Sequence, residues 1–199
     1  MRRYLLILTA LTALTVPFPT GQLLVDAPLQ PRFTTTGYQR QQAFGPGWAV
    51  GPNGCDSRQT AMAAAWSTPC TVAYRDWDVG PIRDPYTGDN LLPIDVEIDH
   101  IYPLSAAWDM GAHAWPQEMR LAFANDPLNL TVTSSRANQS KSDALPGEWM
   151  PPDRLARCAY SRRISAVASK YNLPFTREDQ RAMRRSCGGF QGLISRRSL

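Results

Sequence analysis

Hydrophobic and polar positions alternate most clearly over residues 91–99, LLPIDVEID. Apolar residues at positions 94, 96 and 98 are interleaved with carboxylates at 95, 97 and 99. A period of two residues is typical of a half-buried strand. We therefore predict a strand whose polar face carries three carboxylates, with Asp99 the last of them. Glu97 shares the face of Asp99, and we interpret it as a solvated strand residue rather than as a group behind a metal ligand.

A second short strand is predicted over residues 128–133, LNLTVT, and helical signals surround both strands. Asp56 is predicted to cap a helix that continues through Trp66, because Ala and Met favour the helix. Another helix is predicted over residues 114–124. A further one should follow the second strand towards residue 143, with Ser134 or Ser135 as its N-cap.

Two basic helices are predicted to close the chain, at about residues 153–188. The first carries an apolar stripe at helical spacing, formed by Tyr160, Ile164, Val167 and Tyr171. The second begins at a capping-box pattern of Thr176 and Asp179. Four basic residues share one face of this second helix: Arg177, Arg181, Arg184 and Arg185.

Charge is unevenly distributed along the 199 residues, whose formal net charge is +4. Residues 151–199 contain eleven Lys or Arg and three Asp or Glu, so this part carries +8 and the rest of the chain −4. A basic end beside an acidic middle suits a polyanionic partner held near a metal site. A solvated basic helix face is the alternative.

The N-terminus has the order of a secretory signal peptide. Arg2 and Arg3 precede an uncharged, mostly apolar run over residues 4–16, which is shorter than the roughly 20 residues that span a bilayer. We predict that residues 1–27 are the signal peptide, with cleavage near Thr20 or at the end of this segment. The protein would then be secreted or lie in the cell envelope, without stable membrane association. An uncleaved N-terminal anchor is the alternative, because no further charge appears before Asp26.

The chain contains four cysteines, and an even number in an exported protein favours two disulfides. Four cysteines allow three connectivities. Proximity along the chain favours Cys55–Cys70 and Cys158–Cys187. A zinc site is the rival interpretation, but the chain has no C-x-x-C pair and only two histidines.

Candidate chemistry lies between residues 93 and 143, in the predicted order strand, loop, strand, helix. Phosphodiester hydrolysis needs an attacking hydroxide, a counter-charge for the transition state and a stabilised leaving oxygen. The Asp99 carboxylate and the Asn138 amide oxygen are hard ligands that suit Mg²⁺. His100 is the natural base for the water. Lys141 and Arg136 could hold phosphate at the start of the helix.

These segments resemble the ββα-metal, or HNH, endonuclease motif, and most of all its secreted branch with a GmrSD-type HNH domain. The resemblance rests on DHIYPLSAAW (99–108), FANDPLNLTV (123–132) and NQSKSD (138–143), and on GCDSR (54–58), DPYTG (84–88) and EWMPP (148–152). It covers the chain from about residue 37 to residue 188.

The resemblance assigns roles to individual residues. It implies that Asp99 and Asn138 bind the metal, that His100 is the general base, and that Asn129 ties the loop between the strands and orients the histidine. Because the last ligand is Asn rather than His, Mg²⁺ or Mn²⁺ is expected rather than zinc. Apart from the resemblance, we predict that Arg58 either reaches the scissile phosphate as a catalytic residue or forms a cap or ion pair with Asp56.

The prediction is thus an α+β fold, with residues 28–199 forming a single HNH nuclease domain, in which a ββα-metal core at about 93–143 is embedded in helices and two disulfides are formed. The expected function is an exported, Mg²⁺-dependent endonuclease of low sequence specificity, with DNA rather than RNA as substrate. Whether a cognate inhibitor protein binds the nuclease is left open. Expected nucleic-acid contacts are Arg136, Lys141, Arg177, Arg181 and Arg184. The alternative is a non-catalytic, exported nucleic-acid-binding protein with a degenerate HNH fold.

Overall fold

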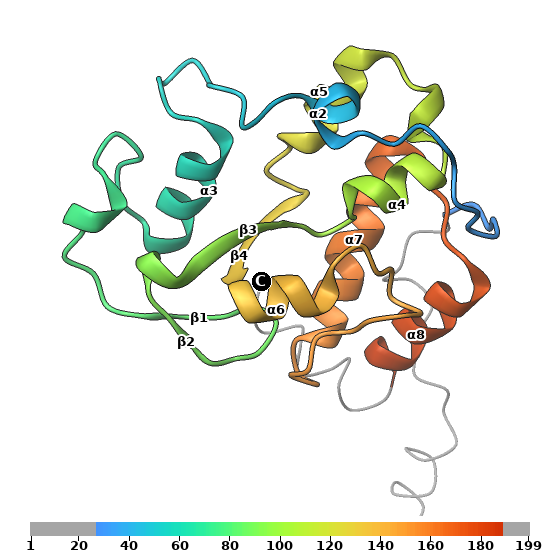
Figure 1. The fold of residues 1–199 in the computed structure, drawn as a ribbon. Coiled ribbons are helices and arrows are strands. Elements are labelled where there is room, and N and C mark those ends of the chain that lie inside the picture. Colours follow the sequence, from blue (N-terminus) through green and yellow to red (C-terminus); the bar gives the residue numbers. More distant parts are fainter. Residues whose placement is uncertain (1–26, 189–199) are drawn as a thin grey trace, which may run out of the picture.

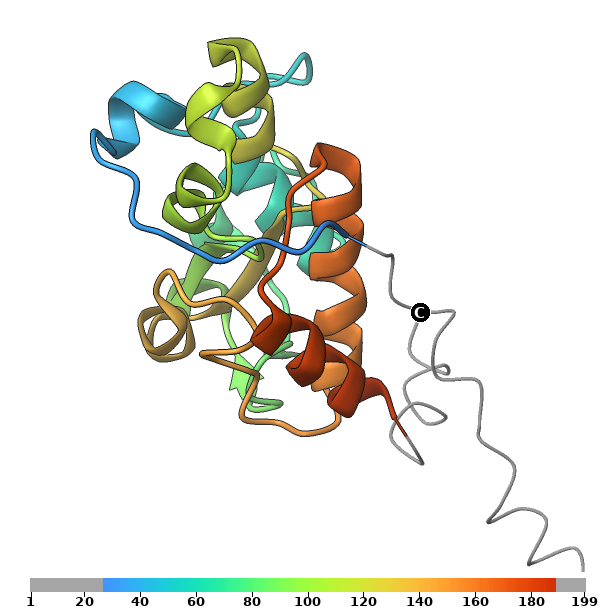
Figure 2. The ribbon, with the colours of Figure 1, turned by 90° about the vertical axis from the view of Figure 1, so that its right-hand side faces the viewer.

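The computed structural model describes residues 27–188 and combines helices with two small antiparallel sheets (Figures 1 and 2). The predicted signal peptide falls almost entirely on residues 1–26, outside this range. Within the described residues, no helix is both long and apolar enough to cross a membrane.

The central sheet pairs β3 (Val96–His100) with β4 (Leu130–Ser134). In the antiparallel register Asp99 lies opposite Thr131 and His100 opposite Leu130. Helix α6 (Ser135–Lys141) follows β4 directly and contacts both strands. The Ser134 side chain accepts a hydrogen bond from the backbone N–H of Ala137, which confirms one of the two predicted caps.

The first strand was predicted too long. Pro93–Asp95 form a short 3₁₀ helix, η2, so that β3 begins only at Val96. Proline has no N–H to donate to a ladder, and its fixed φ suits the first turn of a helix. Ile94 is therefore 67% exposed instead of facing a core. A polar face of three carboxylates is also wrong, since Asp95 precedes the strand and Asp99 is buried.

The second sheet is a small hairpin of β1 (Ile82–Arg83) and β2 (Asn90–Leu91), with the DPYTG segment as its turn. Asp84, in this turn, is 2% exposed and reaches the end of β4. Its carboxylate accepts hydrogen bonds from the Thr133 hydroxyl (2.8 Å) and from the Ser134 N–H (2.9 Å). The hairpin is thereby held against the start of α6.

Helices cover both sides of the central sheet (Figures 1 and 2). One buried cluster lies between the sheet and α3 (Ser57–Trp66), and includes Met62, Trp66 and Ile98. The larger cluster joins the remaining helices, which are α2 (Arg40–Phe44), α4 (Leu104–Asp109), α5 (Gln117–Ala124), α7 (Arg157–Tyr171) and α8 (Arg177–Cys187). Two further 3₁₀ turns are η1 (Tyr74–Asp76) and η3 (Ala112–Ala114).

Several helix boundaries agree with the sequence patterns. Asp56 caps α3 through a capping box with Gln59, and Thr176 caps α8 through one with Asp179. The helix predicted over residues 114–124 begins at Gln117 instead, directly after Pro116.

Both predicted disulfides are confirmed. Cys55–Cys70 closes a loop that contains α3, and Cys158–Cys187 joins α7 to α8. Proximity along the chain selected the correct one of three connectivities.

Candidate functional site

Three of the predicted site residues line one cavity of about 410 Å³ at the end of β3. Asp99 and His100 come from β3 and Asn138 from the first turns of α6. Arg40 and Ser105 also line it, from α2 and α4. Residues that are far apart in the sequence therefore meet at one surface hollow, because α6 folds back across the strand that carries Asp99.

His100 is held in a defined tautomer. Its Nε2 lies 2.8 Å from the carbonyl oxygen of Ala124, and a carbonyl only accepts, so Nε2 carries the proton. The Trp48 ring stacks on the imidazole with centroids 5.5 Å apart and planes within 15°. Burial lowers the pKa of His100 to about 4, and the positive charges of Arg40 and Lys141 act in the same direction. The imidazole is neutral at pH 7, with the lone pair on Nδ1.

Asp99 sits in a buried network and is only 5% exposed. The Tyr86 hydroxyl donates to its Oδ2 at 2.6 Å. The ammonium of Lys141 lies 3.0 Å from Oδ1 and 2.9 Å from Oδ2, and donates to the backbone carbonyl of His100 at 2.8 Å. Burial raises the pKa of Asp99 and lowers the pKa of Lys141, and the ion pair between them opposes both shifts.

The position of Lys141 corrects the role predicted for it. Its side chain is fully buried, with 0% exposure, so the ammonium does not face a surface that phosphate could approach. The predicted role, holding phosphate at the start of the helix, requires an accessible ammonium. The carboxylate of Asp99 instead provides a partner that makes burial of the charge tolerable.

Glu97 also has a different role from the solvated one expected. Its Oε2 accepts a hydrogen bond from Asn138 Nδ2 at 2.7 Å, and its Oε1 accepts one from the Ser135 hydroxyl at 2.8 Å. These two bonds, the first one above all, lower the pKa of Glu97. Because a carboxylate accepts only, the amide of Asn138 must turn its nitrogen towards Glu97, which leaves Oδ1 as the atom that could bind a cation.

Asn129 ties together the two chain segments that flank the strand pair. It is fully buried, its Oδ1 accepts from the Tyr102 N–H at 2.8 Å, and its Nδ2 donates to the Tyr102 carbonyl at 3.2 Å. Its own carbonyl accepts from the Ile101 N–H. The residues directly after His100 are thus fixed to the residue directly before β4, as a loop-tying role requires.

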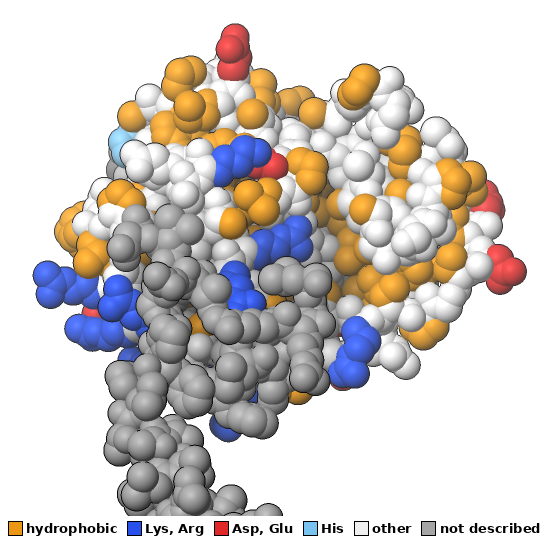
Figure 3. Space-filling view, turned by 180° about the vertical axis from the view of Figure 1, so that it is seen from behind, with side chains coloured by type: hydrophobic (Ala, Val, Ile, Leu, Met, Phe, Trp, Pro, Cys, Tyr) orange, Lys and Arg blue, Asp and Glu red, His pale blue; other side chains and the backbone are white. Residues whose placement is uncertain are grey.

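The other predicted contacts lie outside this cavity. Arg58 donates to the Val96 carbonyl at 3.3 Å and does not reach the cavity or cap α3. Arg136 is 86% exposed on α6 and lies 3.7 Å from Asp89. The basic residues of α8 are exposed, and Figure 3 shows Lys and Arg side chains gathered at the lower left, over that helix. They do not line the cavity that contains His100, whereas Arg40, which no sequence signal indicated, does.

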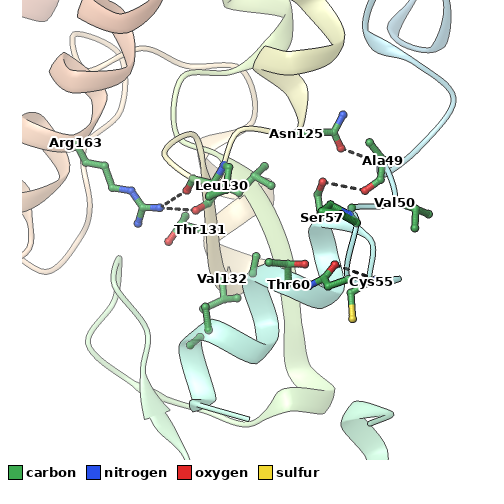
Figure 4. A pocket seen from close by; sticks show the side chains of 17 residues that line it. Ala49, Val50, Cys55, Ser57, Thr60, Asn125, Leu130, Thr131, Val132 and Arg163 are labelled. Carbon is green, nitrogen blue, oxygen red and sulfur yellow. Dashed lines mark hydrogen bonds between the residues drawn. The ribbon is translucent and has the colours of Figure 1, made fainter. Parts of the chain in front are cut away.

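A larger cavity of about 570 Å³ lies on the α3 side of β4 (Figure 4). Its walls are mainly apolar, and Figure 3 shows hydrophobic side chains on this side of the molecule. Arg163 borders it, but its guanidinium is bound to the carbonyls of Pro127, Leu128 and Leu130. The described residues that line this cavity include no carboxylate or imidazole.

Oxygen donors of the kind that a hard divalent cation takes lie around His100, and both oxygens of Asp99 also bind Lys141. Over residues 27–188, no group of three or more His, Cys, Asp or Glu is arranged to hold a metal. Two carboxylates, Asp99 and Asp143, and the amide of Asn138 instead border the same hollow, and Asp143 is paired with Arg32. Mg²⁺ is typically bound in this way, because it keeps several of its waters and takes few protein ligands.

Comparison with known proteins decides the family. The sequence profile described as GmrSD restriction endonucleases, C-terminal domain, matches residues 70–186. The chain belongs to this family. The GmrSD match contains both central strands, α6 and all three candidate residues, whereas α2 and α3 lie before it.

This GmrSD-family chain is also similar to an uncharacterized secreted protein of Arthroderma benhamiae. The two are 32% identical over 200 residues, which cover 90% of this chain and 95% of the fungal protein. No solved structure matches the chain.

Proposed function

We propose that this protein is an exported endonuclease that hydrolyses phosphodiester bonds with a divalent cation, and that β3, β4 and α6 form its ββα-metal element. The single observation that carries the proposal is the meeting of a neutral imidazole, a carboxylate and an oriented amide at one cavity. Membership in the GmrSD family supports nuclease chemistry. The name of the fungal relative supports export, as does the presence of two disulfides.

His100 is the proposed general base. A water that attacks phosphorus must lose a proton, and the acceptor must be unprotonated before the reaction begins. The hydrogen bond to Ala124 commits Nε2 to donation, so Nδ1 takes the proton. Stacking on Trp48 fixes the plane of the ring. These contacts support the proposal, because they leave Nδ1 unprotonated and hold the ring plane before the reaction begins.

Asp99 and Asn138 are the residues that would hold Mg²⁺ or Mn²⁺. When bound, such an ion offsets the charge that builds up on the phosphate and stabilises the leaving oxygen. Tyr86 donates to Oδ2 of the Asp99 carboxylate and Lys141 binds both of its oxygens, while Glu97, itself held by Ser135, accepts from the Asn138 amide. Asn129 holds the loop after His100 in place. Each proposed ligand thus has a supporting group that limits its motion.

The proposed substrate is nucleic acid, with DNA preferred. The exposed arginines of α8 and Arg136 supply positive charge for a phosphate backbone. We expect low sequence specificity, because the sequence carries no established element for reading bases, such as a helix-turn-helix or tandem zinc fingers.

A plasmid-nicking assay tests this function. Wild-type protein is expected to nick supercoiled DNA with Mg²⁺ or Mn²⁺ and to stop when EDTA is added. His100→Ala and Asn138→Ala should each lower the rate by at least about 100-fold, the range expected for loss of a general base or of a metal ligand. His113→Ala is the matched control, since His113 is the other histidine of the chain and is exposed.

The alternative is a binding protein without catalysis. It would be favoured if wild type and His100→Ala bound DNA with the same salt dependence while neither nicked it. Equal nicking by wild type and His100→Ala would contradict the proposed base.

A further inference from the structure

A second cavity, of about 300 Å³, adjoins the proposed catalytic one. The two share three residues, Arg40, His100 and Leu104. His100 therefore forms part of both walls, and Arg40 lies where the two hollows meet. A chain that passes over His100 in one cavity is therefore close to the other.

The two cavities differ in charge. The first is lined by Asp99 and Asp143 in addition to the polar residues of α6. The described residues that line the second include no carboxylate, and its charged member is Arg40. The first cavity thus suits a cation, because carboxylates line it. The second suits an anionic group such as a phosphate, because Arg40 borders it and no carboxylate among its described lining residues opposes the arginine.

The second cavity also has the chemistry that recognises a nucleobase. The Trp48 ring borders it and is half-buried, because it stacks on His100 and packs against the buried cluster beside α3, which leaves part of the ring accessible. Gln41 borders the same cavity from α2 and is exposed, so its amide can both donate to and accept from the edge of a base. Aromatic rings and amides of this kind are the means by which proteins bind unpaired bases.

We propose that this second cavity seats one unpaired nucleotide next to the phosphate that is cut, with Arg40 on the phosphate and Gln41 on the base edge. The preferred substrate would then be single-stranded nucleic acid. In a duplex every base is stacked and paired, so filling the cavity requires extruding one, whereas a single strand can supply an unpaired base directly. This inference rests on the proposed function, because it takes His100 as the site of cleavage.

Two neighbouring glutamines provide a matched pair of variants. Gln41→Glu places a negative charge at the mouth of the second cavity, next to the path of the phosphate backbone. Gln42→Glu makes the same change one residue further along α2, at an exposed side chain that lines neither cavity. A third variant, Gly47→Leu, adds bulk at a cavity-lining glycine where a new Cβ meets nothing within 4 Å.

The experiment measures binding and cleavage of one sequence as a single strand and as a duplex. Binding is followed by fluorescence anisotropy in EDTA, and cleavage by kcat/KM in Mn²⁺. We expect wild type to prefer the single strand by about tenfold or more in both assays, since base stacking on an aromatic ring has this magnitude. Gln41→Glu and Gly47→Leu should remove most of this preference, and Gln42→Glu should keep it.

Equal binding and cleavage of the two forms by wild type would overturn the inference, and so would equal behaviour of the Gln41 and Gln42 variants. The outcome is separable from failure of the proposed function. If wild type cuts neither form in Mn²⁺, the proposed function fails. If it cuts both equally well, the nuclease stands and the nucleotide seat does not.

Discussion

His100 shows how a few contacts set the chemical state of one residue. A single backbone carbonyl determines which ring nitrogen carries the proton, and burial keeps the second proton off. The same burial carries a cost under acidic conditions. At acidic pH the histidine is protonated in the unfolded chain but stays neutral in the folded protein, which favours unfolding.

The stability of the protein should therefore depend on pH through His100. Its pKa is about 4 in the folded protein and about 6.5 in an unfolded chain, so the unfolded state binds more protons between these values. Above pH 6.5 the neutral His100 does not lower the stability of the fold. As the pH falls towards 4, the free energy of unfolding decreases by about 3 kcal/mol in total. Urea unfolding of wild type and His100→Gln at pH 7, 5.5 and 4.5 measures it as a difference that shrinks with acidification. A difference that stays constant over this range would contradict the depressed pKa.

Lys141 acts as the counter-charge of Asp99, and its removal gives a second prediction. Lys141→Met leaves a buried carboxylate without its cation, which should lower the free energy of unfolding by about 3–5 kcal/mol. If Asp99 binds the metal, Mn²⁺ should restore more stability to this variant than to wild type, because the ion replaces the missing charge. Thermal unfolding with and without Mn²⁺ measures both effects.

Lys170→Met is the control for this experiment. Lys170 is half exposed and pairs with Asp126, which keeps hydrogen bonds from Tyr171 and Leu128. A smaller loss without any added response to Mn²⁺ is expected. The same Mn²⁺ response in both variants would argue against Asp99 as a ligand.

At the scale of elements, the site depends on how the β1–β2 hairpin docks against the central sheet. Asp84 makes this contact: it accepts from the Tyr86 N–H within its own turn, from the Thr133 hydroxyl, and from the Ser134 N–H at the start of α6. Burial alone would raise the pKa of Asp84, but these hydrogen bonds lower it overall. The hairpin also positions Tyr86, which donates to Asp99.

Asp84→Ala should therefore loosen several elements together. The change leaves three donors without their buried acceptor, and we expect a loss of about 3–5 kcal/mol in the free energy of unfolding. Nicking activity should fall as well, because Tyr86 and α6 lose a common anchor. Asp89→Ala is the control in the same hairpin, since Asp89 is exposed. Chemical denaturation and the nicking assay of the two variants measure the difference.

Local patterns in the sequence predicted the elements that depend on neighbouring residues. The caps of α3, α6 and α8 follow from side chains within three residues of the helix start, and each is present. The start of β3 was misplaced because the alternation continued through Pro93, where the ring favours a turn. Contacts that join distant segments, such as Arg40 beside His100, leave no periodic trace and could not be read from a pattern.

The candidate site was only partly predictable, because some of its features depend on contacts between distant segments. The spacing of Asp99, His100 and Asn138 identified three residues that do line one cavity. The burial of Lys141 and the bond between Glu97 and Asn138 depend on how α6 lies across β3. Charged residues are exposed more often than not, so composition alone favours the wrong interpretation for both.

At the scale of the whole molecule, the two disulfides close separate parts of the fold. Cys55–Cys70 spans α3, beside the apolar cavity, and Cys158–Cys187 joins the two C-terminal helices. Neither of the loops that these disulfides close includes a residue of β3, β4 or α6. The elements that carry the proposed chemistry are held instead by backbone pairing, by Asn129 and by Asp84. The disulfides therefore contribute to stability without directly fixing the geometry of the site.

Removing one disulfide should thus reduce stability without abolishing function. A variant with Cys158→Ser and Cys187→Ser frees a loop of 29 residues and is expected to lose about 3–4 kcal/mol on unfolding, since the open chain gains entropy. Its nicking rate at temperatures where it remains folded should stay within about threefold of wild type, because no proposed ligand or base moves by the change. Denaturation curves and nicking rates at 20 °C measure the two quantities separately. A variant that is stable but inactive would show instead that α7 and α8 transmit their packing to the cavity, and the basic face of α8 would then have to be considered part of the site.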